Sequence, residues 1–354
     1  MSKKIKNILV LEDESYYKGL LHFNNDCFNV TYNGMLFYKY SDKFLLKFDL
    51  IINFTYNSDL MNYIVSRANF LHIYTLLIAD GIFEWSNAFN NRIFKNNNLI
   101  LFHPIIHDSF MCVGENERNY FNYNGIKTLK YLPIRMKPRL KKIGHMNTDR
   151  FLITTSNTSY FTNHEKKSLL ELLNKIIKTL EVLNKPYSFR IFDEYLINKL
   201  SINNKINITE GDFEQCLKNH DFIITTSSSI SYLAMFHDKP VAHIQYRDTP
   251  VFIRSGWNIN SIINLSQTIQ SMLERDKHRM KFQRFQVLNY NSSNPFLENT
   301  ISFEKNQQKI VDLNPSILKL LNSKYNFNFE YSMRKIFLLL KKNKILKNLF
   351  NKLK

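Results

Sequence analysis

The twelve residues Ile223-Ile224-Thr225-Thr226-Ser227-Ser228-Ser229-Ile230-Ser231-Tyr232-Leu233-Ala234 form the most informative segment of this chain. A short apolar run leads into five consecutive hydroxyl side chains and then into a helical pattern, which predicts a buried strand followed by a helix. At such a helix start the backbone N–H groups and the helix dipole favour an anion. One hydroxyl is enough to cap a helix, so the run from Thr225 to Ser229 predicts a phosphate site, with an ordinary cap as the simpler alternative.

The residues around this segment predict a domain of alternating strands and helices. Predicted strands lie at 151–155, 188–192, 222–225 and 241–245. Predicted helices lie at 164–183, 194–200 and 213–218, and the first has a continuous apolar face. This alternation is typical of a parallel sheet that helices cover on both faces.

The first part of the chain shows the same alternation, with predicted strands at 7–11, 50–54, 73–79 and 99–102. Prolines and basic residues then interrupt the pattern before residue 151. We therefore predict an α/β fold of two Rossmann-like domains that face a cleft, at 1–135 and 151–300, joined by a linker at 136–150. A helical segment at 301–330 and a basic amphipathic helix at 331–354 complete the predicted organisation.

The net charge of +18 favours an anionic partner such as a nucleic acid, a membrane surface or a phosphorylated substrate. A composition rich in Lys, Asn, Ile and Phe is an alternative origin for part of this charge. The three cysteines are far apart in the sequence, which fits a reducing compartment. No apolar run approaches the roughly 18 residues of a spanning helix, so we expect a soluble or peripheral protein.

The segment 331–354 carries eight basic residues and no acidic one. From Ile345 onward, Leu346, Leu349 and Leu353 share one helical face while the lysines occupy the other. Such a helix binds flat on an anionic membrane, where each cation contributes about 1 kcal/mol. The alternatives are a helix docked on the first domain and a frayed tail. Basic patches with aromatic platforms are missing, so we predict no nucleic-acid partner.

Two positions in the first half are candidates for chemistry. Asp80 ends an apolar run directly before Gly81, and Glu84 follows four residues later. A carboxylate at the end of a buried strand can act as a general base or a nucleophile, although Asp is also a common helix cap. His103 ends another predicted strand and is a candidate substrate contact. Its partner His107 at i+4 does not form a zinc motif, because Pro104 interrupts the helix that this motif needs.

The second half offers further candidate ligands at predicted strand ends. We predict contacts to a donor substrate from Thr155, Ser156, Arg190, Asp193 and Glu194, in addition to Thr225, Thr226, Ser227, Ser228 and Ser229. A structural ion pair for Arg190 and a solvated loop at Thr155 and Ser156 are the alternatives. Arg247 and Arg254 follow the last predicted strand, and their guanidinium groups suit anionic sugars.

Missing motifs narrow the class of enzyme. The eight glycines are never closer than Gly114 and Gly125, so neither a G-x-G-x-x-G nor a Walker loop exists. An NAD-dependent or P-loop enzyme is therefore unsupported. No Asp-x-Asp pair occurs, which removes the metal-binding motif common in single-domain sugar transferases. We expect no metal and no cofactor besides a nucleotide-sugar donor.

With Asp80-Gly81 and the serine cluster in place, the chain resembles bacterial GT-B glycosyltransferases, and among them the CMP-sugar users: sialyl-, polysialyl- and Kdo transferases. These enzymes carry an acid before Gly at a first-domain strand end and a Ser/Thr pair at a second-domain helix start. The resemblance implies donor phosphate contacts at Thr226 to Ser229 and a base or nucleophile at Asp80. The His-Pro pair of sialyltransferases is replaced here by the segment 190–193, which favours Kdo or another acidic sugar.

The resemblance implies transfer of a CMP-linked acidic sugar, without metal, to a surface glycan or lipid-linked acceptor of capsule, O-antigen or lipooligosaccharide. The first domain would bind the acceptor and the second the donor. We expect the enzyme on the cytoplasmic face of the bacterial inner membrane, attached through 331–354. A CDP-glycerol or CDP-ribitol polyol-phosphate transferase and a non-catalytic nucleotide-sugar-binding partner are the alternatives.

Overall fold

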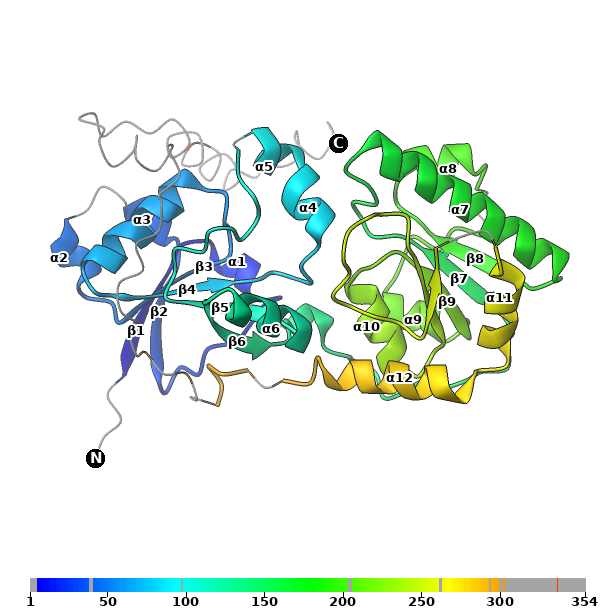
Figure 1. Ribbon diagram of the computed structural model, residues 1–354. Coiled ribbons are helices and arrows are strands. Elements are labelled where there is room, and N and C mark those ends of the chain that lie inside the picture. Colours follow the sequence, from blue (N-terminus) through cyan, green and yellow to red (C-terminus); the bar gives the residue numbers. More distant parts are fainter. Residues whose placement is uncertain are drawn as a thin grey trace.

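The computed structural model describes residues 5–303, except 38–40, 97, 203–205, 261–262, 293, 299–300 and 302, together with Ile336. Two α/β domains lie side by side, each with helices around a central sheet (Figure 1). This arrangement confirms the predicted fold class of two Rossmann-like domains. Apart from Ile336, the predicted membrane-surface helix at 331–354 lies outside the described residues. Within the described part, no helix is long and apolar enough to cross a membrane.

The first domain contains a parallel sheet of six strands in the order β2-β1-β3-β4-β5-β6. The strands are β1 (Lys6–Val10), β2 (Phe28–Thr31), β3 (Leu50–Asn53), β4 (Tyr74–Ile78), β5 (Ser109–Val113) and β6 (Lys127–Tyr131). Its helices are α1 (Glu14–Tyr17), α2 (Asp42–Leu45), α3 (Asp59–Phe70), α4 (Trp85–Asn90), α5 (Arg92–Asn96) and α6 (Glu115–Tyr123). The 3-10 turns are η1 (Gly34–Phe37) and η2 (Ile134–Met136). Every residue of the central strands β3 and β4 is buried because helices cover both faces of the sheet, and most of these residues are apolar.

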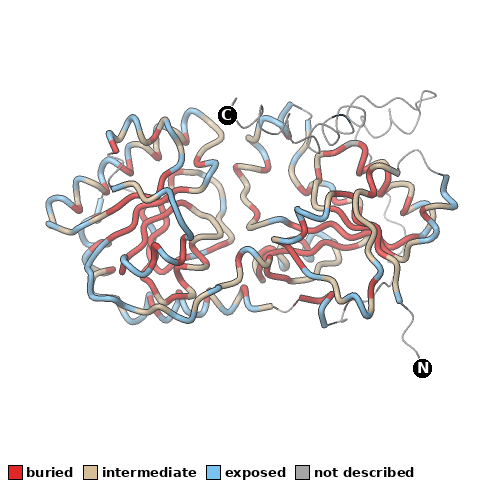
Figure 2. The backbone as a smooth tube through the Cα atoms, turned by 180° about the vertical axis from the view of Figure 1, so that it is seen from behind, coloured by how far each residue is buried: buried red, intermediate tan, exposed pale blue. Residues whose placement is uncertain are grey.

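The second domain contains a parallel sheet of five strands in the order β11-β10-β9-β7-β8. The strands are β7 (Phe151–Thr154), β8 (Tyr187–Arg190), β9 (Phe222–Thr225), β10 (Val241–Ile244) and β11 (Trp257–Ile259). Its helices are α7 (Asn163–Val182), α8 (Glu194–Lys199), α9 (Phe213–Leu217), α10 (Ser229–Phe236), α11 (Leu265–Leu273) and α12 (Lys277–Leu288). The two buried sheets form the interior of the molecule (Figure 2).

One predicted strand, at 99–102, is wrong. The backbone here forms local bonds instead: Leu99 N–H donates to the carbonyl of Phe94, and His103 N–H donates to that of Ile100. The next apolar run, β5, occupies the sheet position, and all five of its residues are buried. The segment 99–102 therefore forms a turn outside the sheet, which places His103 in a loop.

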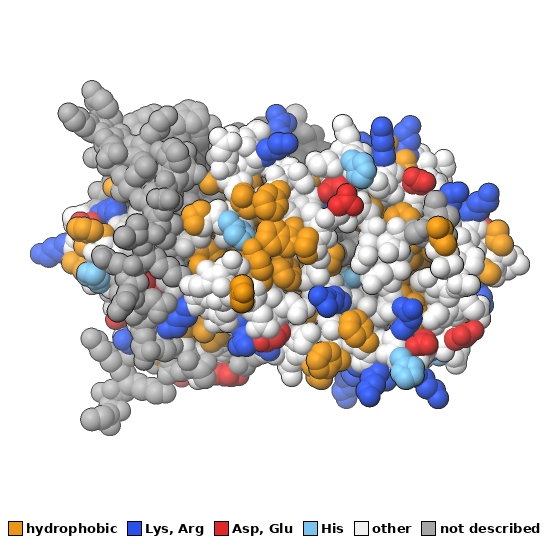
Figure 3. Space-filling view, viewed as in Figure 1, with side chains coloured by type: hydrophobic (Ala, Val, Ile, Leu, Met, Phe, Trp, Pro, Cys, Tyr) orange, Lys and Arg blue, Asp and Glu red, His pale blue; other side chains and the backbone are white. Residues whose placement is uncertain are grey.

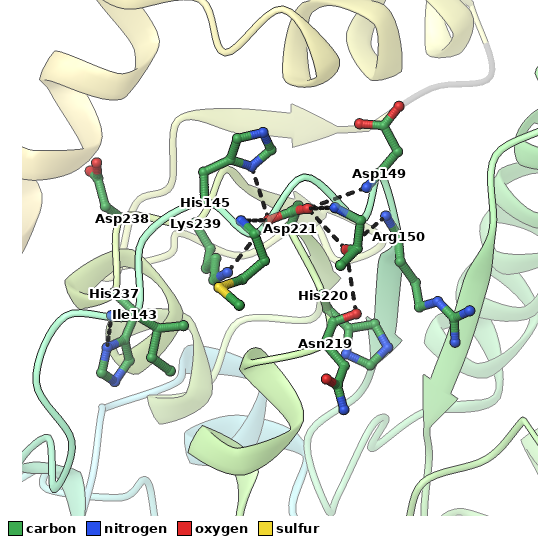
Figure 4. A network of polar contacts seen from close by, with 12 residues as sticks. Ile143, His145, Asp149, Arg150, Asn219, His220, Asp221, His237, Asp238 and Lys239 are labelled. Carbon is green, nitrogen blue, oxygen red and sulfur yellow. Dashed lines mark hydrogen bonds and ion pairs between the residues drawn. The ribbon is translucent and has the colours of Figure 1, made fainter.

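The linker is fixed to the second domain by a buried carboxylate, that of Asp221 (Figure 4). It accepts hydrogen bonds from the backbone N–H groups of Met146 at 2.6 Å and Thr148 at 2.5 Å, and it lies 3.6 Å from the Lys239 ammonium. Although burial alone would raise the pKa of Asp221, these hydrogen bonds hold it below its ordinary value. Because Asp221 precedes β9, this network lies at the opposite end of the strand from the hydroxyl cluster.

After α12 the chain returns to the first domain. Asn294 donates a side-chain hydrogen bond of 2.9 Å to the carbonyl of His22. The ring of Phe296 packs against Phe23 at 4.9 Å and Phe28 at 5.6 Å between centroids. The end of the predicted 151–300 domain thus packs on the other domain: α12 lies along one side of the second domain, and the chain after it continues along the first (Figure 1).

Candidate functional site

A cavity of about 490 Å³ lies between the domains. Phe83 and Glu84, from the loop after β4, line it on one side. Ser227, His243 and Arg254, which follow β9 or lie on and beyond β10, line it on the other. The carboxyl ends of parallel strands are where ligands bind in open α/β sheets. The cavity therefore has the position expected of a substrate site in a two-domain fold.

The hydroxyl cluster lies at the start of α10, as the sequence predicted. Ser228 is the N-cap residue, but its hydroxyl makes no capping bond and is buried without a hydrogen-bond partner among the described residues. Ser229 begins the helix, and Ser227 lines the cavity. Simple helix capping therefore does not account for the Ser228 hydroxyl.

The loop after β7 lies against the same cluster. Thr226 accepts a 2.8 Å hydrogen bond from the backbone N–H of Ser156, while Thr225 donates to the carbonyl of Thr226 at 3.0 Å. Thr155 is 1% exposed, and its hydroxyl has no hydrogen-bond partner within the described part. The structure thus brings the ends of β7 and β9 together and leaves two buried hydroxyls, on Thr155 and Ser228, unpaired.

His243 extends this polar wall but brings no charge to it. Its Nε2 lies 2.7 Å from the hydroxyl of Ser231, in the first turn of α10. Burial lowers the pKa of His243 to about 4, so the ring is neutral at pH 7. Arg254, in contrast, is exposed, lines the cavity and forms no hydrogen bond or ion pair with any described residue. Arg254 is therefore a cation available to an anionic ligand.

Asp80 is exposed in the loop after β4, with 61% of its side chain accessible, but it is not isolated. The guanidinium of Arg135, on η2, contacts the Asp80 backbone carbonyl and lies 3.5 Å from its carboxylate. A Cβ on Gly81 would approach that guanidinium to 3.3 Å, so glycine makes room for the pair. The turn η2 also packs against α10. The turn that carries Arg135 therefore packs on the helix that follows the hydroxyl cluster, but neither Asp80 nor Arg135 is among the residues that line the cavity.

Glu84 and Arg247, predicted separately, form an ion pair with each other across the domain boundary. Glu84 is the N-cap residue of α4, and Arg247 follows β10. Arg247 is nearly buried, and it also donates to the carbonyl of Ser159 at 2.9 Å. Neither side chain is therefore free to act on a ligand as the structure stands.

The structure keeps other predicted residues out of the cavity lining. The guanidinium of Arg190 donates to the carbonyls of Ile208, Glu210 and Gly211 at 2.8 to 3.1 Å, which is a structural role. Asp193 caps α8 by accepting from Leu196 N–H at 2.9 Å, and Glu194 is exposed in the first turn. These residues belong to the edge strand β8 and its loop.

His103 packs in an aromatic cluster of the first domain. Its Nδ1 faces the carbonyl of Leu101 at 2.8 Å, and its Nε2 lies 3.0 Å from the Tyr120 hydroxyl. Its ring stacks on Trp85 at 5.7 Å, and Trp85 stacks on Phe89 at 5.5 Å. Apolar side chains gather near the middle of this face of the molecule (Figure 3). His103 is therefore part of a packed surface cluster beside the cavity.

Sequence reasoning missed two charged residues near Asp80. Arg135 lies at the end of the predicted first domain, and no sequence pattern indicates that it pairs with Asp80, 55 positions earlier. Glu117, on α6, is buried, and its carboxylate accepts from the N–H groups of Phe83 at 2.6 Å and Val113 at 3.2 Å. Burial raises its pKa to about 8, and these hydrogen bonds offset only part of the effect. Glu117 thus holds the loop that carries Asp80 and Glu84.

The comparisons with known proteins support the fold. No family model and no curated protein matches the sequence. Among solved structures, the S. aureus MnaA-UDP co-structure has a TM-score of 0.52 and 11% identity, covering 84% of this chain and 95% of that chain. A putative UDP-N-acetylglucosamine 2-epimerase from Listeria monocytogenes has a TM-score of 0.52 and 12% identity, with the same coverage. At such low identity the likeness shows the fold alone, and the chain has the two-domain GT-B architecture.

Proposed function

We propose that this protein binds a nucleotide-sugar in the cavity and transfers the sugar to an acceptor. The observation that carries the proposal is the pair of buried, unpaired hydroxyls on Thr155 and Ser228 beside the start of α10. A buried polar group without a partner is costly, and a phosphate bound at the start of α10, next to Ser227 of the cavity lining, would offer such hydroxyls an acceptor. Arg254 supplies a cation on the same side of the cavity. The second domain thus has the parts of a donor-phosphate site.

Asp80 is the better of the two carboxylates for the chemistry on the first-domain side. Its side chain is accessible, whereas that of Glu84 is paired with the nearly buried Arg247. As a general base, Asp80 would remove the proton from the acceptor hydroxyl; as a nucleophile, it would form a glycosyl-enzyme. Both routes place the reaction between Asp80 and the donor phosphate, without a metal ion.

The donor nucleotide is open to a direct test. The names of two fold relatives include UDP or a UDP-sugar, which makes UDP the first nucleotide to try. The sequence resemblance favours a CMP-linked acidic sugar of the Kdo or sialic acid type, and CDP would indicate a polyol-phosphate transferase. The increase in melting temperature on adding UDP, CMP or CDP identifies which of these nucleotides the protein binds. Absence of stabilisation by all three would refute the donor assignment.

A UDP-sugar 2-epimerase is the second candidate, because one of the two fold relatives is described as such an enzyme. An epimerase converts the donor itself and needs no acceptor. Incubating the protein with UDP-N-acetylglucosamine alone and following the product by NMR distinguishes the two reactions. Epimer formation without acceptor would replace transfer as the function.

The role of Asp80 is tested by Asp80→Asn. We expect turnover to fall by about 10²- to 10⁴-fold, the usual contribution of a positioned acid or base, while nucleotide binding persists. Asp42→Asn is a matched control, because Asp42 is also an exposed first-domain carboxylate paired with an arginine, Arg67. Near-normal transfer by the Asp80 variant would show that the carboxylate has no catalytic role.

The acceptor and the location remain part of the proposal. We propose a glycan or lipid-linked acceptor of the cell surface, bound on the first-domain side, and attachment to the inner face of the membrane through the basic segment 331–354. Sedimentation with anionic vesicles, compared between the full chain and a variant that ends at residue 330, tests the attachment. Equal sedimentation of the two would remove the membrane role of the segment.

A further inference from the structure

Four side chains from the two domains meet at one side of the cavity. Glu84 and Ser86 come from the start of α4 in the first domain. Glu165, in the first turn of α7, and Arg247, after β10, come from the second. We call this set, Glu84, Ser86, Glu165 and Arg247, the interdomain latch.

Two polar contacts of the latch cross the domain boundary. The Arg247 guanidinium pairs with the Glu84 carboxylate, and the Ser86 hydroxyl donates to the Glu165 carboxylate. A third contact lies within the second domain, where Arg247 Nε is 3.5 Å from Glu165 Oε2. One guanidinium therefore serves two carboxylates that belong to different domains.

The second-domain half of the latch is fixed by its own domain. Glu165 accepts from the backbone N–H of Phe161 at 2.7 Å and completes a capping box with Thr162. Arg247 donates to the carbonyl of Ser159, and its guanidinium lies 5.3 Å from the centroid of the Phe161 ring. The two charged groups are thus held by contacts within the second domain that do not involve the first, so the surface on which the first domain packs is preorganised.

Burial makes these contacts depend on each other. The side chains of Arg247, Glu165 and Glu84 are 6%, 8% and 23% exposed. Burial lowers the pKa of Arg247 only to about 10, so it stays cationic at pH 7. Without this cation, two poorly solvated carboxylates would face each other across the boundary, which favours separation of the domains.

The boundary next to the latch contains backbone contacts as well. Glu84 and Val251 form an antiparallel bridge, and the Asn116 side chain donates to the carbonyl of Phe252 at 2.8 Å. Glu84, Arg247 and Val251 also line the cavity. Separation of the domains at this point would therefore open one wall of the cavity.

We propose that Arg247 is a positioning residue: through the interdomain latch it holds the domains closed over the cavity, so that a ligand can contact both walls at once. Closure is then coupled to binding. A ligand that contacts both walls binds the closed form more tightly, and its apparent affinity falls with the fraction of molecules that are closed. The latch itself does not depend on which nucleotide the cavity accepts.

The test compares Arg247→Met with Arg284→Met by small-angle X-ray scattering of the full chain without ligand. Arg284 is a matched control because it forms a two-bond pair with Asp238 inside the second domain and does not reach the first. We expect a larger radius of gyration for the Arg247 variant and a wild-type value for the control. Circular dichroism verifies that both variants fold.

Two further variants and a ligand titration sharpen the result. Glu84→Gln removes one charge at the boundary while Arg247 and Glu165 stay paired, so we expect a smaller increase in the radius of gyration than for Arg247→Met. Arg247→Lys keeps the positive charge, so we expect a radius of gyration between those of the wild type and Arg247→Met. With UDP as the probe, we expect Arg247→Met to raise Kd by about 5- to 150-fold, the usual range of coupling between linked sites. At saturating UDP the radius of gyration should return toward the wild-type value.

Equal radii of gyration for wild type, Arg247→Met and Glu84→Gln would overturn the latch. Expansion of the variants without any binding of UDP, CMP or CDP by the wild type would support the latch and refute the proposed donor site. Scattering therefore tests the latch and nucleotide binding tests the donor site, and either hypothesis can fail without the other.

Discussion

Glu117 offers a sharp test of how this first domain is built. The residue is 1% exposed, and burial raises the pKa of its carboxyl group from 4.5 to about 8. Between these two values the unfolded chain releases the proton while the folded protein keeps it. Because the unfolded state then binds fewer protons, the free energy of unfolding falls as pH rises through this window.

The size of the effect follows from the width of the window. Each pH unit lowers the free energy of unfolding by about 1.4 kcal/mol, so the change from pH 4.5 to pH 8 is at most about 5 kcal/mol. Glu117→Gln keeps the shape and an acceptor for the Phe83 N–H but cannot ionise. It loses the longer bond from Val113, a cost of about 1 kcal/mol that does not vary with pH.

The assay is urea unfolding of both proteins at several pH values from 5 to 9. Relative to wild type, we expect Glu117→Gln to be slightly less stable near pH 5 and clearly more stable above pH 8. Other titrating groups are common to both proteins and cancel in the difference. Parallel pH profiles for the two proteins would refute the argument, because they would show that Glu117 titrates alike in the folded and unfolded states.

Two further substitutions test other parts of the fold. Asp221→Asn leaves the buried Lys239 ammonium without its counter-charge, so we expect the free energy of unfolding, measured in urea, to fall by about 3–5 kcal/mol. The control Asp149→Asn alters a surface ion pair and should leave the free energy of unfolding nearly unchanged. In Gly114→Ala the backbone has a φ of +91°, and the added Cβ would lie 2.7 Å from the Tyr290 ring. In Gly125→Ala φ is also positive, but no atom lies within 4 Å of the added Cβ. Calorimetry should therefore show a larger loss of Tm for the Gly114 variant. A Tm loss as large for Gly125→Ala would show that backbone strain alone is responsible.

The central strands of both sheets were predictable from sequence because burial on both faces leaves a continuous apolar run. The strand β9 has the predicted bounds, and β3 and β10 differ from the prediction by one residue at their ends. The strands β2 and β6 were missed because they are sheet edges, only partly buried and with polar residues in each. These two edge strands lack the apolar run on which the prediction depended, whereas the edge strand β8 was predicted.

The position of several candidate residues at strand ends could be predicted, but their pairings could not. Strand ends and a hydroxyl-rich helix start are local patterns, so the sequence located Asp80 and Ser228 at the carboxyl ends of their sheets. The partners of the charged groups come from distant parts of the chain: Arg135 lies 55 positions after Asp80, and Arg247 belongs to a different domain from Glu84. Only the tertiary packing, within the first domain for Asp80 and between the domains for Glu84, determines which acids are paired.

The return of the chain after α12 has a mechanical consequence. The polypeptide crosses between the domains twice, once through the linker that Asp221 fixes and once through the segment that ends at Phe296. A pair of separate crossings acts as a two-point hinge: it permits rotation about the line that joins the crossings and resists twisting or sliding. A protease cut at either crossing would therefore leave the halves of the molecule covalently joined, but free to turn about a single point.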